Sequence, residues 1–479
     1  MINKTSSNTK NNTTKGVETL LGEPKKAIRK LALPMMIALS ATTIYNLVDA
    51  LWVSGFGQNI FTSAEIADVG TGALNAVGFV LPFYMMLISV STGLGIGAGS
   101  AISRRIGADD KKGADNVAIH SIIITLIIAV AFTTILFAFA DKIFISIGAK
   151  ETIRMSTSYG RVIFSGAFFI FFANMALAIL RAEGDANRAM YAMLFGAILN
   201  LVLDPIFIYT FKLGVTGAAY ATVLSMAITC LILIYWLFLR KNTYVNFKFK
   251  AFRFKKDIVK DIFRVGLPAS VQQLSMSISM IILIIIIGLA GGGEDGVGVY
   301  NTGWRIVMIA VLPLLGMATA VVSVTGATFG AKSYNKLNTA FMYAVKVGFI
   351  IEIFLAIIIF ILAPYITMVF TTKADINFIE NLEMFLKITV FFYPFAAFGI
   401  VSSSMFQGVG KGTYSLIATL LRTMVFLVTF AFISIYIFNA GLMGVWWTLV
   451  FANLAGSIFS FTWAKFYIKN LLSKNKFSS

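Results

Sequence analysis

Twelve long apolar segments constrain the fold of this chain more than any other feature. A helix needs about 20 predominantly apolar residues to span a bilayer, and only 13% of the residues here are charged, whereas soluble domains carry roughly 25%. Because lipid offers no water to the backbone, apolar segments of this length must be helical. We expect an all-α integral membrane protein with twelve transmembrane helices, near residues 31–54, 72–99, 119–140, 157–180, 190–211, 214–239, 264–290, 299–326, 340–365, 384–407, 413–438 and 442–467.

Lysine and arginine lie mainly in alternate loops. The 240–264 segment carries nine of them, whereas the loops around 55–70 and 290–298 carry none. The positive-inside rule then places both termini in the cytoplasm, in a multi-pass protein of the cell (plasma) membrane. The net charge of +18 follows from this topology and attracts anionic membrane lipid, so a nucleic acid partner is not expected.

Residues for covalent or metal chemistry are scarce. The chain has one cysteine, Cys230, and one histidine, His120, which excludes an internal disulfide and a Cys/His metal site. A membrane-embedded enzyme would need a nucleophile with a base, or a metal site, and few candidates exist. We therefore expect neither an enzyme nor a bound cofactor.

The two halves of the chain resemble each other. Four pairs of positions recur at similar offsets: Pro34 and Pro268, Gly107 and Gly330, Gly184 and Gly410, and Gly214 and Gly441. The glycines taken one at a time are also explained by close helix packing. Together the pairs predict a tandem duplication of a six-helix unit.

A duplicated unit with an even number of spans gives two halves of the same orientation. Their symmetry axis then runs along the membrane normal, an arrangement typical of transporters that handle substrate between the halves. The predicted parts are a disordered cytoplasmic tail (1–24), an N-terminal six-helix lobe (25–239), a basic cytoplasmic linker (240–263), a C-terminal six-helix lobe (264–470) and a second cytoplasmic tail (471–479).

Acids inside the spans are the strongest functional signal. A charge near the centre of a membrane helix costs about 2.5–3.5 kcal/mol and is by default functional or paired. Three acids qualify, namely Asp49, Asp204 and Glu352. At ~1.5 Å per residue, Asp49 lies about 9 Å from the outer end of its span, and Asp204 and Thr222 lie about 12 Å from theirs. These three side chains therefore share one level in the outer half of the membrane.

Polar side chains accompany both aspartates. Asn200 lies four residues before Asp204 and shares its helical face, as Tyr45 and Asn46 share the face of Asp49. Oxygen ligands of this kind suit a hard cation such as Na⁺. Two carboxylates that lose water together also repel each other, so that the pair would hold a proton near neutral pH.

A structural role is the alternative for these acids. Each aspartate would then only hydrogen-bond a helix break, such as the one expected beside Pro205. Glu352 has no acid or amide at a comparable position nearby, and both a structural pair and a functional role stay open for it.

The sequence resembles one transporter family. The stretches "YNLVDALWVSGFG", "RAEGDANRAMYAM", "LNLVLDPIFIY", "LGVTGAAYATVLSM" and "GATFGAKSYNK" are similar to the multidrug and toxic compound extrusion (MATE) family, and to its DinF-type branch. The similarity extends from about residue 20 to 469. It implies a V-shaped pair of six-helix bundles that exports organic cations in exchange for H⁺ or Na⁺.

The resemblance also implies roles for individual residues. It implies a cation site in the N-terminal lobe at Asp49, Asn200, Asp204 and Thr222. It further implies a bend of the first helix at Pro34 and a polar lining at Tyr45, Asn46, Tyr159 and Asn174. The acids that the NorM-type branch has in its seventh and tenth helices are absent, which argues against a cation site in the C-terminal lobe.

Two other transporter classes compete with this interpretation. A lipid-linked saccharide flippase of the same superfamily would favour extra C-terminal spans and a cationic central cavity, and neither is evident. A major-facilitator transporter also has twelve spans, but "SRRIGADD" matches the loop of that family poorly. We expect an antiporter of small organic cations that acts as a monomer.

Overall fold

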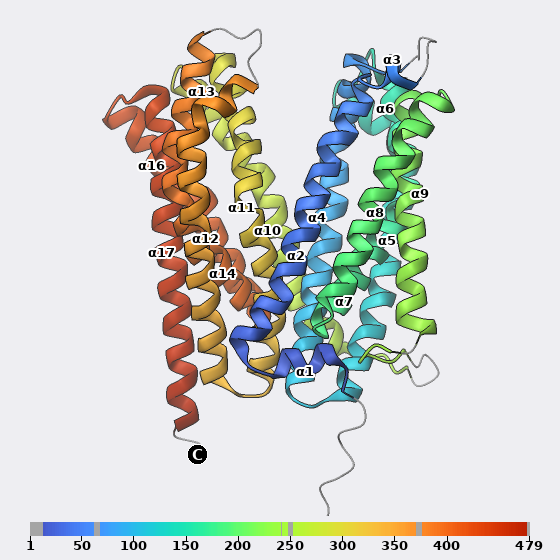
Figure 1. Cartoon of the computed structure of the whole chain (residues 1–479), viewed down its shortest axis with the longest axis vertical. Coiled ribbons are helices and arrows are strands. Elements are labelled where there is room, and N and C mark those ends of the chain that lie inside the picture. The colour runs from blue at the N-terminus through green and yellow to red at the C-terminus, as the bar shows by residue number, and fades with distance from the viewer. Residues whose placement is uncertain (1–12, 62–67, 241, 248–251, 370–375, 477–479) are drawn as a thin grey trace, which may run out of the picture.

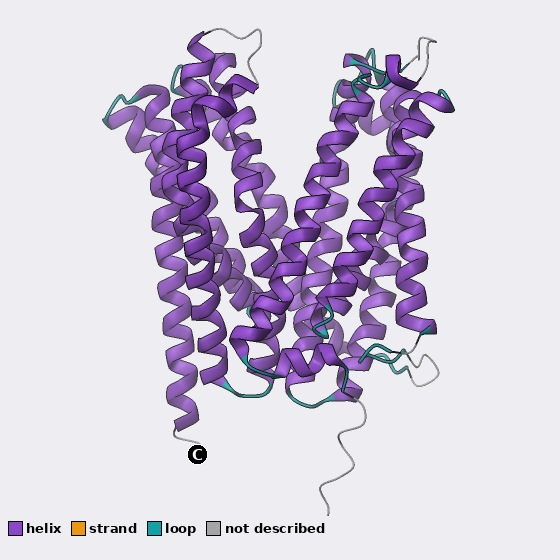
Figure 2. Cartoon of the chain, in the orientation of Figure 1, coloured by secondary structure: helices purple, strands orange, loops and turns teal. Residues whose placement is uncertain are grey.

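The computed structural model describes residues 13–61, 68–240, 242–247, 252–369 and 376–476, and every regular element in these ranges is helical (Figure 2). The first half contains α1 (Lys15–Leu21), α2 (Pro24–Val53), α3 (Gln58–Phe61), α4 (Thr71–Gly107), α5 (Lys111–Ser146), α6 (Ile153–Ser165), α7 (Ala167–Ala182), α8 (Ala186–Pro205), η2 (Ile206–Thr210), α9 (Gly214–Ile234) and η3 (Tyr235–Leu239). The second half contains α10 (Lys256–Leu289), α11 (Gly293–Gly330), α12 (Tyr334–Val369), α13 (Ile376–Thr389), η5 (Val390–Phe392), α14 (Tyr393–Gly408), α15 (Gly412–Leu420), η6 (Leu421–Val425), α16 (Phe426–Phe432), η7 (Ile433–Ile437) and α17 (Gly441–Lys476).

The helices form two bundles arranged as a V. In Figure 1 the first bundle contains α2 to α9 and the second contains α10 to α17. The bundles meet at the end that holds α1 and the turns after α4 and α11, which we call the closed end, and they diverge toward the opposite, open end (Figure 1). This confirms the expected all-α architecture of two bundles that together form a V.

The number of spans agrees with the expectation of twelve. Eleven of the described helical segments are long and apolar enough to cross a membrane. A twelfth span results when α6 and α7 are counted as one, although they meet at an angle of 43°. The span expected at 157–180 is a bent pair, with the bend at Gly166, where a Cβ would lie only 2.4 Å from the side chain of Val223.

The predicted tails and linker are more ordered than expected. Residues 15–21 of the supposedly disordered tail form α1, because Thr14 caps the helix by accepting a hydrogen bond from the Val17 backbone N–H, and Val17 and Leu20 are buried. The C-terminal helix α17 extends to Lys476, and α10 begins at Lys256, inside the predicted linker. Residues 1–12 and 477–479 lie outside the described part of the chain, and the exact division into lobes and linker stays a prediction.

Backbone conformation supports the internal repeat. The paired glycines Gly184 and Gly410 both have φ of +83°, a left-handed value that favours glycine. Gly214 and Gly441, the other helix-start pair, have φ of +53° and +56°. Residues predicted to be equivalent from their spacing therefore make equivalent turns.

Two glycines bring the bundles into backbone contact at the closed end. A Cβ added at Gly107 of α4 would lie 1.8 Å from the carbonyl oxygen of Ala327 on α11. A Cβ added at Gly330 of α11 would lie 1.9 Å from the carbonyl oxygen of Arg104 on α4. Gly107 and Gly330 are the repeat-related pair of the sequence, so each half supplies one side of a reciprocal crossing.

Polar contacts reinforce this crossing. Asp261 of α10 accepts hydrogen bonds from Arg104 Nη2 at 2.6 Å and from Arg105 Nη1 at 2.8 Å. Ser100 of α4 donates to the carbonyl oxygen of Gln407 on α14 at 2.5 Å. All these groups are partly or fully buried, where charge-assisted hydrogen bonds are strongest.

The linker between the halves is held against the first bundle. The carboxylate of Glu183 accepts a hydrogen bond from the Val245 backbone N–H at 3.1 Å, and burial raises the pKa of this carboxyl to about 8. His120 Nε2 accepts from the Lys255 backbone N–H at 3.0 Å. The one histidine of the chain therefore helps to position the linker.

The crossing predicts a sharp size limit at Gly330. In Gly330→Ala the new methyl group would overlap the α4 backbone, so the bundles must separate there, at a cost of about 1–3 kcal/mol for overpacking. We expect a lower thermal unfolding midpoint for the purified protein and slower transport in vesicles.

Gly288→Ala is the matched control, because nothing lies within 4 Å of a Cβ at that position on α10. Alanine there should leave the midpoint unchanged or slightly higher, since alanine favours helix. Equal midpoints for Gly330→Ala and wild type would contradict the described crossing.

Candidate functional site

Asp49 and Asp204 lie together inside the first bundle. Asp49 projects from α2 and Asp204 from the last turn of α8, and their carboxyl groups lie close enough to interact electrostatically. Two neighbouring carboxylates repel each other when both are ionised, which favours a proton or a cation between them. The structure thus brings together the two acids that the depth estimate had placed at one level.

Asn200 connects the acid pair to α9. Its side-chain Nδ2 donates to Asp204 Oδ1 at 3.2 Å and to Thr222 Oγ1 at 3.4 Å. Asn200 is 2% exposed and Asp204 is 0% exposed. Three helices, α2, α8 and α9, therefore supply a shared polar cluster, in which Asn200 and Asp204 are buried and Asp49 and Thr222 are half-buried.

Three oxygen atoms of this cluster lack a donor. Asp49 Oδ1, Asn200 Oδ1 and Asp204 Oδ2 are buried and have no hydrogen-bond partner among the described residues. Buried polar atoms in folded proteins are nearly always paired, and each unpaired one costs about 1–3 kcal/mol. A proton or a small hard cation would satisfy these oxygens.

Tyrosines surround the acid pair. Tyr45 of α2 and Tyr159 of α6 interact electrostatically with both Asp49 and Asp204. Tyr84 of α4 interacts with Asp49 and forms a side-chain hydrogen bond with Tyr45. The sequence interpretation missed Tyr84, whose only signal was a phenol hydroxyl in a largely apolar span.

A helix irregularity follows the acid directly. Pro205 has no N–H to donate to the carbonyl of Leu201, and the wider π turn of η2 begins at the next residue. In this turn Tyr209 donates its hydroxyl proton to the Trp52 carbonyl at 2.5 Å and accepts from the Gly57 N–H at 3.1 Å. Tyr209, also missed from sequence, therefore ties the C-terminal end of α2 to η2.

Three residues with a predicted lining or bending role have no described contact with the acids. Asn174 of α7 donates to Ser91 Oγ of α4 at 3.0 Å, seven residues beyond Tyr84. Asn46 is exposed, and no hydrogen bond from it to the acid pair is described. Pro34 is buried inside the continuous helix α2, near the closed end. The polar lining assigned to Tyr45, Asn46, Tyr159 and Asn174 and the bend assigned to Pro34 all stay predictions.

The second bundle contains a separate buried acid. Glu352 of α12 is 0% exposed, and both its carboxylate oxygens lack a hydrogen-bond partner in the described ranges. Its electrostatic neighbour is Tyr393 of α14. Arg422 is also buried in this bundle and packs against Gly399 and Gly456.

The acid cluster offers two carboxylates and two neutral oxygen ligands, a set that carries little negative charge for a metal site. Within the described residues no group of three or more His, Cys, Asp or Glu side chains stands together. Two carboxylates with one amide and one hydroxyl favour hard monovalent ions or protons over transition metals. The first bundle is therefore suited to taking up and releasing a proton or Na⁺.

Comparison with known proteins identifies relatives along almost the whole chain. The MatE family model matches residues 34–206 and 268–433, one segment in each half. Multidrug export protein MepA of Staphylococcus aureus (strain MSSA476) is 27% identical over 431 residues, which cover 89% of this chain and 90% of that protein. MepA of Staphylococcus haemolyticus (strain JCSC1435) is 26% identical over 430 residues, which cover 89% of this chain and 90% of that protein.

Solved structures share the fold at higher identity. A crystal structure of MATE in complex with MaL6 is 46% identical and superposes with a TM-score of 0.91, covering 96% of this chain and 100% of that one. The outward-facing conformation of a multidrug resistance MATE family transporter of the MOP superfamily is 47% identical with a TM-score of 0.91, covering 96% and 99% of the two chains.

A third neighbour comes from Pyrococcus furiosus Vc1. This MOP superfamily transporter, for which reverse polarity of the binding pocket suggests a different function, is 47% identical with a TM-score of 0.90 and covers 96% of this chain and 99% of its own. Matches in both halves of the sequence, together with a common fold over nearly the whole length, establish that this chain belongs to the multidrug and toxic compound extrusion (MATE) family of membrane transporters.

Proposed function

We propose that the chain is a secondary active antiporter that exports organic cations and amphipathic drugs in exchange for H⁺ or Na⁺. The observation that supports this most directly is the set of unpartnered oxygens on Asp49, Asn200 and Asp204. Uptake and release of a cation there would change the charge inside one bundle during each cycle. The multidrug export function in the names of the relatives is consistent with drugs as the exported substrate.

Antiport requires that ion and drug prefer different states of the protein. A ligand shifts a conformational equilibrium only by its difference in affinity between the two states. An ion that neutralises Asp49 and Asp204 removes their repulsion and lets the surrounding helices approach, whereas the ion-free site keeps a negative charge available for a cationic drug. Binding of one ligand would thereby promote release of the other.

Helix α2 provides a physical route from the ion to the lobe interface. It carries Asp49 in its outer half, and near Met36 its backbone packs against α11 of the other bundle, where a Cβ at Gly316 would lie 2.7 Å from the Met36 nitrogen. Pro34 removes one intrahelical hydrogen bond close to this contact, which makes α2 easier to bend there. We propose that α2 rearranges about Pro34 when the ion site changes its occupancy.

The orientation follows from the basic loops. We propose that the closed end faces the cytoplasm, with both termini there, in the plasma membrane. The open end of the V would then release drug to the outside and load the coupling ion. The same proposal includes a monomer, with the lobes at 25–239 and 264–470 joined by the basic linker.

A lipid-linked saccharide flippase is the second transporter function considered. The relatives described above are multidrug export proteins and MATE transporters, and their names favour drug export over a flippase. The acid cluster also offers no cationic surface for a pyrophosphate. We therefore do not propose a flippase.

The acid pair gives the first test. Asp49→Asn and Asp204→Asn should each reduce dye efflux at least about tenfold, because an amide cannot release a proton or balance the charge of Na⁺. Efflux of a fluorescent organic cation from vesicles, normalised to the protein in the membrane, measures this. Asp141→Asn is the control, since Asp141 is 51% exposed and pairs only with Arg161 at the surface. Wild-type efflux in both site variants would refute the proposed site.

The coupling ion is identified by imposing the gradients one at a time. Vesicles with only a pH gradient and vesicles with only a Na⁺ gradient should differ in dye efflux, and the effective gradient should lose its effect in Asp204→Asn. Efflux that needs neither gradient would contradict antiport.

Thr222 gives a subtler test. Thr222→Val removes the acceptor for Asn200 Nδ2, which should raise the ion concentration for half-maximal efflux by about fivefold, since one hydrogen bond contributes about 1 kcal/mol. Maximal efflux should persist. Thr229→Val is the matched control on α9, because the Thr229 hydroxyl donates to the Ser225 carbonyl of its own helix. An unchanged half-maximal concentration in Thr222→Val would exclude Thr222 from the site.

A further inference from the structure

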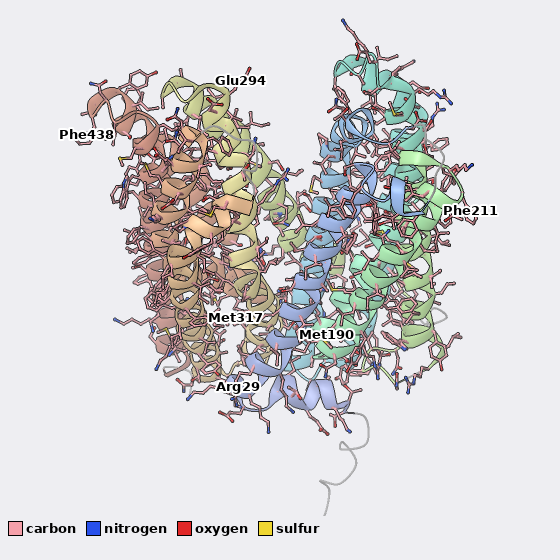
Figure 3. The ribbon with its side chains drawn as sticks, turned by 45° about the horizontal axis from the view of Figure 1, so that its top comes forward. Arg29, Met190, Phe211, Glu294, Met317 and Phe438 are labelled. Carbon is pink, nitrogen blue, oxygen red and sulfur yellow. The ribbon has the colours of Figure 1, made fainter. Side chains whose placement is uncertain are left out.

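A cavity of about 950 Å³ opens at the closed end, between α1, the start of α2 and the start of α8. Arg29 lies at this end of the molecule (Figure 3) and contributes to the cavity wall. Asp49 is 20 residues further along α2, which is about 30 Å of helix. The cavity is therefore distinct from the ion site.

The walls of the cavity are strongly cationic. The charged side chains that line it are Lys15, Lys26, Arg29, Lys30 and Arg188, with Asp185 as the single carboxylate. Asp185 is already engaged, because it accepts from the Arg188 backbone N–H and pairs with Arg188 Nε, each at 3.1 Å. None of the described carboxylates forms an ion pair with the other four cations, Lys15, Lys26, Arg29 and Lys30. The cavity therefore attracts an anion.

Arg188 offers a donor that no described residue accepts. Its Nη1 is buried and has no hydrogen-bond partner among the described residues. A guanidinium donates in a fork that matches the oxygens of a phosphate or carboxylate. An anion with several oxygens would satisfy this donor and balance the neighbouring lysines.

The wall formed by α2 changes from cationic to apolar along one helical face. Lys26, Arg29, Lys30, Leu33 and Pro34 line the cavity at spacings of three and four residues, which places them on one side of the helix. Leu33, on the side toward the membrane, is 61% exposed. A phosphate attached to an acyl chain fits this gradient better than a free phosphate does, because the chain would cover Leu33.

We propose that this cavity binds the headgroup of an anionic glycerophospholipid. The phosphate lies against Arg29, Lys30 and Arg188, and the acyl chain runs along Leu33 into the bilayer. Basic pockets between membrane helices at the cytoplasmic surface recognise such headgroups by this combination of charge and depth. The lipid would join α1 to α2 on the side of α2 that contains Pro34.

The test measures binding to the purified full chain in an uncharged detergent. Thermal midpoints are recorded against increasing phosphatidylglycerol, phosphatidylcholine and inorganic phosphate. We expect phosphatidylglycerol alone to raise the midpoint, since a ligand that binds only the folded state stabilises it. The double variant Arg29→Gln/Lys30→Gln should need at least about tenfold more phosphatidylglycerol for the same shift.

A control separates local recognition from net charge. Lys332→Gln/Lys469→Gln removes two exposed cations elsewhere and should respond to phosphatidylglycerol as wild type does. Equal responses of wild type and Arg29→Gln/Lys30→Gln would overturn the site. A shift with inorganic phosphate as large as that with phosphatidylglycerol would overturn the lipid as its ligand. No transport is measured, so the result does not depend on the proposed antiport.

Discussion

The backbone contact between α4 and α11 determines what the rest of this structure can do. Gly107 and Gly330 allow the two helices to approach until a single added carbon on either would overlap the other backbone. Because the bundles touch at this end, their opposite ends are apart (Figure 1). A transporter that alternates between two sides needs such a contact to form and separate, and a contact made mainly of glycine and a few buried ion pairs involves little side-chain rearrangement.

The acid pair is a second constraint on the fold. Placing carboxyl groups inside an apolar bundle lowers the stability of the folded state, so packing alone does not explain why they are there. Asp204 lies in an apolar bundle at 0% exposure, and a structural role would leave its oxygens fully paired. Instead the cluster retains acceptors without donors on three residues. Folded proteins keep such groups mainly where a ligand completes them, which is why the arrangement supports an exchangeable ion more strongly than a helix break does.

Helix α2 connects these features. Its first turns line the cationic cavity, its middle packs on α11 at Met36, and its outer half carries Tyr45 and Asp49. A helix transmits displacement along its axis, and Pro34 gives this one a weak point between the closed end and the ion site. The proposed ion site, the contact with the other bundle and the proposed lipid site therefore all involve the same helix.

The sequence by itself determined the helical class, the count of spans, the repeat and the acids at one depth. These follow from local properties, namely hydropathy over about 20 residues and the ~1.5 Å rise of a helix. Only the tertiary structure decided which side chains meet: Tyr84 approaches Asp49, whereas Asn174 turns to Ser91. The spacing of residues along one helix indicates the face and the depth of each residue. It does not indicate how neighbouring helices are rotated about their axes relative to that helix. That rotation depends on packing between residues far apart in the chain, as at the glycine crossing, and no single segment encodes it.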